Sequence, residues 1–138
     1  MEKKDNQCGL IFENAKKEIL LQLRDEKPTI KYPGCWGTFG GGVEEGENPK
    51  EAIKREVKEE LNYNLKNPEF FGNFPFQGHN QFMFRKVDKN IKMGNFEVKE
   101  GQKGEFFSFE NALKLKLASN DREIIIKYFK KFHREDVK

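Results

Sequence analysis

A glycine triplet followed at once by a capped helix constrains the fold of this sequence more than any other feature. The triplet occupies residues 40–42, and the segment after it carries the signals of a helix. Asn48 can cap the first turn, the proline after it suits the first helical position, and Glu51 stands where the carboxylate of a capping box belongs. Asn62 takes the left-handed position that ends a helix. The sequence therefore predicts a helix that begins from Asn48 and ends at Leu61, directly behind a glycine-rich loop.

Outside this segment, apolar runs predict several strands and two further helices. Residues 10–12 and 18–23 are extended runs separated by a polar turn, which indicates a hairpin. Prolines and glycines make residues 25–37 an irregular loop. Further strands are expected at 69–76, 81–87 and 105–109, and helices at 109–113 and 121–132. This order predicts a single domain over residues 1–138, with an α/β fold in which helices flank a mixed β-sheet.

The composition is that of a chain with a heavily solvated surface: 36% of the residues are hydrophobic, 36% are charged, and the mean hydropathy is -0.89. Every apolar run is far shorter than the roughly 20 residues of a membrane span, and the first residues lack the apolar stretch of a signal peptide. The two cysteines suit free thiols in a reducing compartment. We therefore expect a cytoplasmic protein that does not enter a membrane.

The 26 Lys and Arg residues exceed the 23 Asp and Glu residues by a net charge of +3, but the two signs are unevenly distributed. Between Glu44 and Glu60, seven glutamates face four basic residues, whereas residues 114–138 carry eight basic residues against four acidic ones. A solvated amphipathic helix accounts for this basic tail better than a binding patch does, so nucleic acid is not the expected partner. Salt-sensitive RNA binding by the tail would instead favour a role in processing RNA ends.

Glutamates dominate the predicted helix and the loop before it. Gly41 and Gly46 are spaced as in a phosphate-binding P-loop, but glutamate and asparagine follow where that loop needs lysine and serine or threonine. A phosphate bound here would therefore need bridging cations. Glu56, Glu59 and Glu60 fall within an arc of about 100° on the helix, and such a cluster of oxygen ligands favours magnesium or manganese. A solvated Glu-Lys-Arg helix face is the simpler alternative.

The spacing of these residues resembles the Nudix box of the Nudix hydrolase family. The matching positions are, in order, Gly41, Glu47, Arg55, Glu56, Glu59 and Glu60. The sequence departs from the box at its end, where Asn62 replaces the usual glycine. The resemblance implies a Nudix-type α/β/α sandwich in which Glu59 and Glu60 are the principal metal ligands and Glu56 is a further ligand or the general base. It also implies that the Gly40 carbonyl is a ligand and that Glu47 orients Arg55, which braces the loop against the helix.

The resemblance to MutT-type members of this family continues beyond the box. Residues 99–106 resemble the loop that brings a distant glutamate to the metals, and Glu105 is the match, with an exposed strand-edge carboxylate as the alternative. Residues 118–120 resemble the segment whose asparagine hydrogen-bonds the base, which implies that role for Asn120; a cap of the last helix is the alternative. Arg24 is a further substrate-binding candidate. The aromatic side chains near it are candidates as well, although most aromatics are expected in the core.

The resemblance implies a pyrophosphohydrolase that depends on Mg²⁺ or Mn²⁺. Its substrate would be a nucleoside diphosphate linked to another group, first of all a nucleoside triphosphate, damaged ones included, which it would cleave to the monophosphate and pyrophosphate. A pyrophosphatase for ADP-ribose or another nucleotide sugar is the alternative within the same chemistry. A nucleotide-binding module without catalysis is the alternative outside it.

Overall fold

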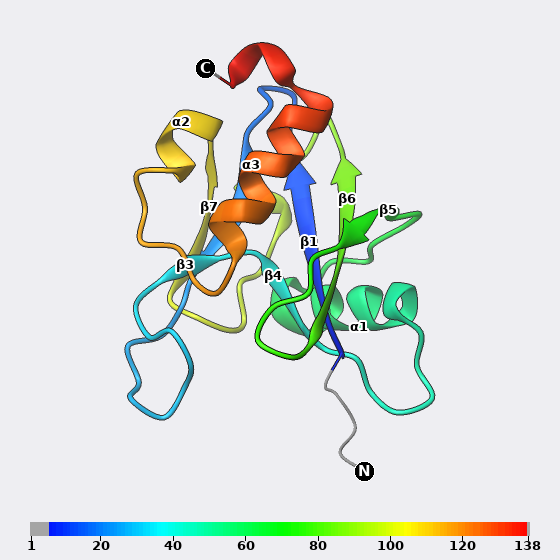
Figure 1. The fold of residues 1–138 in the computed structure, drawn as a ribbon. Coiled ribbons are helices and arrows are strands. Elements are labelled where there is room, and N and C mark those ends of the chain that lie inside the picture. The colour runs from blue at the N-terminus through cyan, green and yellow to red at the C-terminus, as the bar shows by residue number, and fades with distance from the viewer. Residues whose placement is uncertain (1–5, 138) are drawn as a thin grey trace.

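The computed structural model describes residues 6–137, and Figure 1 shows their arrangement. The strands are β1 (Asn6–Glu13), β2 (Ile19–Leu23), β3 (Trp36–Gly37), β4 (Phe39–Gly42), β5 (Glu69–Asn73), β6 (Asn80–Val87) and β7 (Lys103–Phe107). The helices are α1 (Pro49–Leu61), α2 (Phe109–Ala112) and α3 (Asp121–Phe132), with the 3-10 turns η1 (Met93–Asn95) and η2 (Arg134–Asp136). All the predicted helices are present, and each lies within one residue of its expected bounds.

The strands form one mixed sheet with β1 in its middle. The strand order is β3-β2-β1-β6-β5, with β4 also paired to β1 and β7 to β2. β1 and β6 run parallel from the pair Asn6↔Asn80 to the pair Glu13↔Val87, and the other strand pairs are antiparallel. The expected hairpin is realised at the single pair Glu13↔Ile19, after which β2 pairs with β3 and β7 instead.

β3 and β4 lie where the sequence predicted irregular backbone. β3 falls inside the expected loop, and β4 contains the glycine triplet. Gly40 has a φ of 152°, and a Cβ at this position would lie 2.0 Å from the carbonyl oxygen of Cys8 on β1. Only glycine therefore lets β4 pair so closely with β1. These glycines form a strand because of the backbone beside them, which a local pattern does not reveal.

Side chains alternate along β1 between two hydrophobic clusters, one on each face of the sheet. Leu10 and Phe12 belong to the cluster that contains the apolar stripe of α1, and Ile11 belongs to the cluster that contains the apolar side of α3. Each fully buried side chain of this size contributes about 1.5–3 kcal/mol relative to an exposed one. α1 and α3 thus cover opposite faces of the sheet, which confirms the predicted α/β fold with a mixed sheet and flanking helices.

Both predicted ends of α1 are confirmed. The Asn48 side chain accepts a hydrogen bond from the Glu51 amide, and the Glu51 side chain accepts one from the Asn48 amide, which is a complete capping box. At the other end Asn62 is left-handed, with φ 52° and ψ 39°, and its amide donates to the Lys58 carbonyl. These two ends fix where the glutamates of α1 stand relative to β4.

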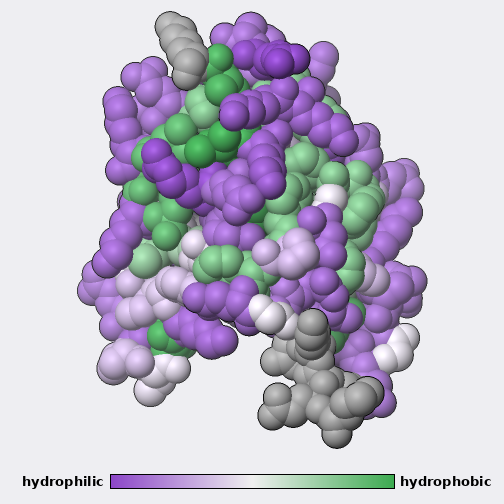
Figure 2. All heavy atoms as spheres, viewed as in Figure 1, coloured by the Kyte–Doolittle hydropathy of each residue, from purple (hydrophilic) through white to green (hydrophobic). Residues whose placement is uncertain are grey.

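The face of the molecule shown in Figure 2 is mostly polar. Figure 2 shows hydrophilic side chains over most of one face, with smaller hydrophobic patches between them. Phe70 of the edge strand β5 is 55% exposed. Among residues 6–137, the helices are too short and too polar to cross a membrane.

Candidate functional site

A glutamate in the last turn of α1 contacts the backbone of β4, the strand that contains the glycine triplet. Glu60 is 3% exposed, and its Oε1 accepts a hydrogen bond of 2.9 Å from the Gly40 amide of β4. Glu56 lies one turn earlier on the same side of the helix. A Cβ on Gly41 would lie 2.7–2.8 Å from the Glu56 carboxylate, so the glycine allows this approach. The glycine triplet and the helix are thus two halves of one acidic site.

Arg55 ties the loop before α1 to the helix. Its Nε and Nη2 donate to the two carboxylate oxygens of Glu47 at 2.9 and 3.0 Å, and Nη2 also donates to the Gly42 carbonyl at 2.9 Å. Nη1 donates to Glu56 at 2.9 Å and lies 3.3 Å from the more exposed Glu59. The opposite charges stabilise each other: the neighbouring carboxylates raise the pKa of Arg55, and Arg55 lowers the pKa of Glu47. The structure therefore brings Glu47 and Arg55 together as a brace.

The electrostatics of Glu60 fit a site for a cation. Burial, together with the nearby charges of Glu56 and Glu100, raises the pKa of Glu60 to about 9, and the hydrogen bond from Gly40 opposes this rise only in part. Burial also raises the pKa of Glu56, against the opposing charge of Arg55. Carboxylates crowded in this way repel one another, and a divalent cation with oxygen ligands would relieve that repulsion. The donor set therefore suits Mg²⁺ or Mn²⁺.

The third acidic partner is Glu100, and the prediction for Glu105 is wrong in its placement. Glu105 lies opposite Leu21 in the β2–β7 pair, and opposite residues point to the same face of a sheet. Leu21 belongs to the cluster on the α3 face, so Glu105 points away from α1 and is exposed. Glu100 instead lines a cavity of about 400 Å³ together with Gly40 and Glu60. The sequence contains a signal for the direction of Glu105. Phe106 is apolar and packs on the α1 side of the sheet, so the residue before it in the strand must point to the other side.

A second, larger cavity of about 810 Å³ adjoins the smaller one, which we call the acidic cavity because Glu60 and Glu100 line it. Arg24, Asp25, Lys27 and Lys99 line the acidic cavity as well. Gly40 and Arg24 line both cavities, so the two share a wall. Among the other lining residues are Tyr32, Thr38, His79 and Asp121. Arg24, a substrate-binding candidate, thus lies in the wall between the two cavities. Its Nε donates to the Lys31 carbonyl at 3.0 Å, which holds the loop over the cavity.

Asp121 is a residue that the sequence gave no reason to select, because an acid in the first turn of a helix is ordinary. It is 7% exposed, and its Oδ2 accepts a hydrogen bond of 3.0 Å from the Thr38 amide. Burial raises its pKa to about 6, although the Thr38 hydrogen bonds and the charge of Arg24 act in the opposite direction. The wall of the larger cavity thus includes a buried carboxyl group with a raised pKa.

Asn120, the candidate for a hydrogen bond to the base, uses its side chain to contact the protein itself. Its Nδ2 donates to the Phe74 carbonyl at 3.1 Å, its Oδ1 accepts from Ser119, and it is 8% exposed. It is absent from the lining of both described cavities. It also occupies the cap position of α3, but within the described chain its side chain makes no capping hydrogen bond. Its side chain instead joins the start of α3 to the backbone after β5.

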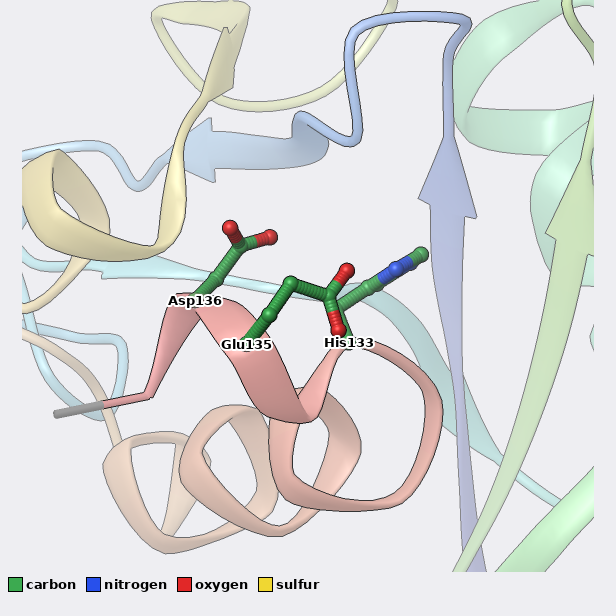
Figure 3. A group of neighbouring side chains, drawn as sticks. All are labelled: His133, Glu135 and Asp136. Atoms are coloured by element: carbon green, nitrogen blue, oxygen red, sulfur yellow. The ribbon is translucent and has the colours of Figure 1, made fainter.

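Figure 3 shows another group of potential metal ligands, at the C-terminal end of the described chain. Ligand atoms of His133, Glu135 and Asp136 lie within 4.8 Å of one another, and within residues 6–137 this is the one group of three that meets that spacing. His133 Nε2 already lies 2.7 Å from Glu13, and Glu135 lies 2.8 Å from Lys17. The carboxylates of Glu56, Glu60 and Glu100 are more widely spaced, so those side chains would have to turn inward around a cation.

Comparisons with known proteins identify relatives of this chain. A family model described as NUDIX domain matches residues 3–128. The curated nucleoside triphosphatase NudI of Escherichia coli is 41% identical over 58 residues, which are 42% of this chain and 39% of that protein. The chain thus aligns with about two fifths of the length of the curated relatives it matches.

Two solved structures share the fold. One, from a study of MutT from Aliivibrio salmonicida and Vibrio cholerae, superposes with a TM-score of 0.78 at 21% identity, over 94% of this chain and all of the other. The other is the NUDIX domain of NrtR from Shewanella oneidensis, solved with ADP ribose, with a TM-score of 0.78 at 13% identity over 95% and 90% of the two chains.

Proposed function

Because this chain belongs to the NUDIX domain family, we propose that it is a metal-dependent hydrolase of phosphoric anhydride bonds in nucleotides. One observation carries the proposal: a buried glutamate on α1, Glu60, meets the backbone of a glycine strand between two adjoining cavities. The acidic cavity would take the cation and the anhydride. The larger one would take the nucleoside.

Residues around the acidic cavity would hold Mg²⁺ or Mn²⁺ in named roles. Glu60 and Glu100, which line the cavity, would supply carboxylate oxygens, and Gly40 would supply its carbonyl. Glu56 and Glu59, which neighbour Glu60 on α1, would supply further carboxylate oxygens. A bound divalent ion neutralises phosphate charge and lowers the pKa of a bound water. Arg55 would keep the loop seated on α1 through its paired hydrogen bonds to Glu47. Glu105 is replaced by Glu100 in this assignment because only Glu100 lies on this side of the sheet.

The shape of the site favours a substrate with a charged end and a nucleoside end. Arg24 lines both cavities, and a guanidinium there can contact a phosphate that spans them. A nucleoside triphosphate is the first candidate, since the NudI relative is a nucleoside triphosphatase. Water would attack one phosphorus and break the anhydride, giving the monophosphate and pyrophosphate. ADP-ribose is the second candidate, since the NrtR domain was solved with it.

A substrate panel with identified products tests this proposal. The protein is incubated with Mg²⁺ or Mn²⁺ and with nucleoside triphosphates, modified triphosphates, ADP-ribose and other nucleotide sugars. Pyrophosphate plus a monophosphate supports the first candidate, and AMP plus a sugar phosphate supports the second. Glu60→Gln should lose most of the turnover, and Glu105→Gln should keep it. Nucleotide binding without turnover under any of these conditions would assign the chain to the class of binding modules and refute the enzyme.

A further inference from the structure

We propose that Gln22 of β2 is a positioning residue that holds Glu100 at the acidic cavity. The inference depends on the proposed function, because it assumes that Glu100 is a ligand there. Glu100 is exposed and belongs to residues 97–102, which lie outside the helices and strands of the fold. A side chain in such a position keeps considerable conformational freedom unless its backbone is fixed.

The Gln22 side chain makes the direct contact. Its Nε2 donates a hydrogen bond of 2.7 Å to the carbonyl oxygen of Glu100. Gln22 is 5% exposed, and it lies two residues after Leu20, so it shares the α1 face of the sheet. A glutamine is unusual among buried side chains. The hydrogen bond from its amide to the loop explains why this polar side chain is buried here.

Gly101 fits the same contact from the side of the loop. Its φ is 80°, a left-handed conformation that glycine adopts without strain. A Cβ there would lie 2.8 Å from Gln22 Nε2 and 2.8 Å from the Leu23 carbonyl oxygen. The loop can therefore approach β2 closely enough for the hydrogen bond only because residue 101 has no side chain.

Backbone hydrogen bonds anchor the loop on both sides of Glu100. The Lys99 amide donates to the Glu60 carbonyl at 2.8 Å, and the Gln102 amide donates to the Leu23 carbonyl at 2.9 Å. These bonds join the loop to the end of α1 and to the end of β2. Between them, the carbonyl of Glu100 itself is held by Gln22. We infer that this third anchor sets the direction in which the Glu100 carboxylate leaves the backbone.

Metal affinity measured apart from turnover tests the inference. Binding of Mn²⁺ alone, followed by electron paramagnetic resonance and calorimetry, is compared in the wild type, Gln22→Met, Glu100→Gln and the double variant. Gln22→Met keeps the length of the side chain and removes the donor, so we expect affinity to fall by about tenfold, as for other residues that orient metal ligands. If Gln22 acts through Glu100, the double variant should bind no more weakly than Glu100→Gln. Glu105→Gln is the matched control and should bind as the wild type does.

The outcomes separate this inference from the proposed function. Wild-type affinity in Gln22→Met, or losses that add in the double variant, would overturn the role of Gln22 and leave the proposed function standing. A wild type that binds no Mn²⁺ would overturn both. If Gln22→Met does not fold, Gly101→Ala tests the same contact from the loop, with the same expected loss. Hydrogen exchange of the Lys99 and Gln102 amides should also be faster in either variant, a loosening that a distant structural defect would not confine to this loop.

Discussion

Glu60 is a carboxyl group that the fold buries against a backbone amide and other acids. In Glu60→Gln the amide oxygen can still accept the hydrogen bond from Gly40, and the side chain keeps its shape. We therefore expect the metal-free variant to unfold with a free energy equal to or above that of the wild type at pH 7. Thermal unfolding with and without Mn²⁺ should show stabilisation by the ion in the wild type and its loss in the variant, with turnover reduced on the order of 100-fold. A variant that Mn²⁺ still stabilises would show that Glu60 is not a ligand.

Asp121 makes the stability of the fold depend on pH. Its pKa rises from an ordinary 3.8 to about 6 in the folded protein, so the folded state binds more protons than the unfolded state between these values. Its contribution is then fully present below about pH 4 and is lost as the pH rises through 6. The loss is about 3 kcal/mol by the usual conversion of a pKa shift.

Asp121→Asn provides the measurement. Asparagine cannot ionise, and its oxygen can still accept from the Thr38 amide. Urea unfolding of the wild type and the variant at several values between pH 4 and pH 7.5 should give a stability difference that shifts in favour of the variant as the pH rises. Parallel pH profiles for the two proteins would mean that another carboxyl group dominates this range.

At the scale of an element, α1 ends on a residue that tolerates its conformation without being ideal for it. Asn62 is left-handed, and its Nδ2 donates to Glu97 at 3.1 Å. Asn62→Ala should lower the free energy of unfolding by about 1 kcal/mol, because alanine resists the left-handed region. Asn62→Gly should remain within about 0.5 kcal/mol of the wild type, because the relaxed backbone offsets the lost hydrogen bond. Chemical unfolding of the three proteins decides this, and equal stability of the alanine variant would contradict it.

Elements defined by local signals were predictable, and those defined by distant partners were not. The two ends of α1 follow from Asn48, Glu51 and Asn62, which act within a few residues of themselves. β4 could not be predicted in this way, because its glycines form a strand only through their pairing with β1, where the backbone of Cys8 lies against Gly40. Glu105 was selected on a local resemblance, but the face of the sheet to which it points depends on the register of β7 against β2, which pairs residues 80 to 88 positions apart.

At the scale of the whole molecule, β1 connects the proposed site to a buried polar group at its other end. The Tyr128 hydroxyl donates to Glu13 Oε1 at 2.6 Å, and His133 Nε2 lies 2.7 Å from the same oxygen. Tyr128→Phe removes one partner of a buried carboxylate and should lower the free energy of unfolding by about 1–3 kcal/mol. Mn²⁺ affinity should not change, because Gly40 of the proposed metal site pairs with Gly9 of β1, four residues before Glu13. A parallel fall in affinity would reveal coupling along β1.

Residues 97–102 are anchored to both α1 and β2. This anchoring affects whether the glycine-and-glutamate motif of residues 40–62 could work outside this protein. The amides of Glu97 and Lys99 donate to the carbonyls of Leu61 and Glu60, so this segment covers the end of the motif's own helix. A peptide spanning residues 40–62 would contain most of the proposed ligands, yet it would lack Glu100, the amide of Gln22 and the strand that gives Gly40 its conformation. Such a peptide should be a poor chelator. The proposed chemistry depends on the assembled tertiary structure, and a designer who wished to reproduce it would have to copy these three further parts of the chain as well.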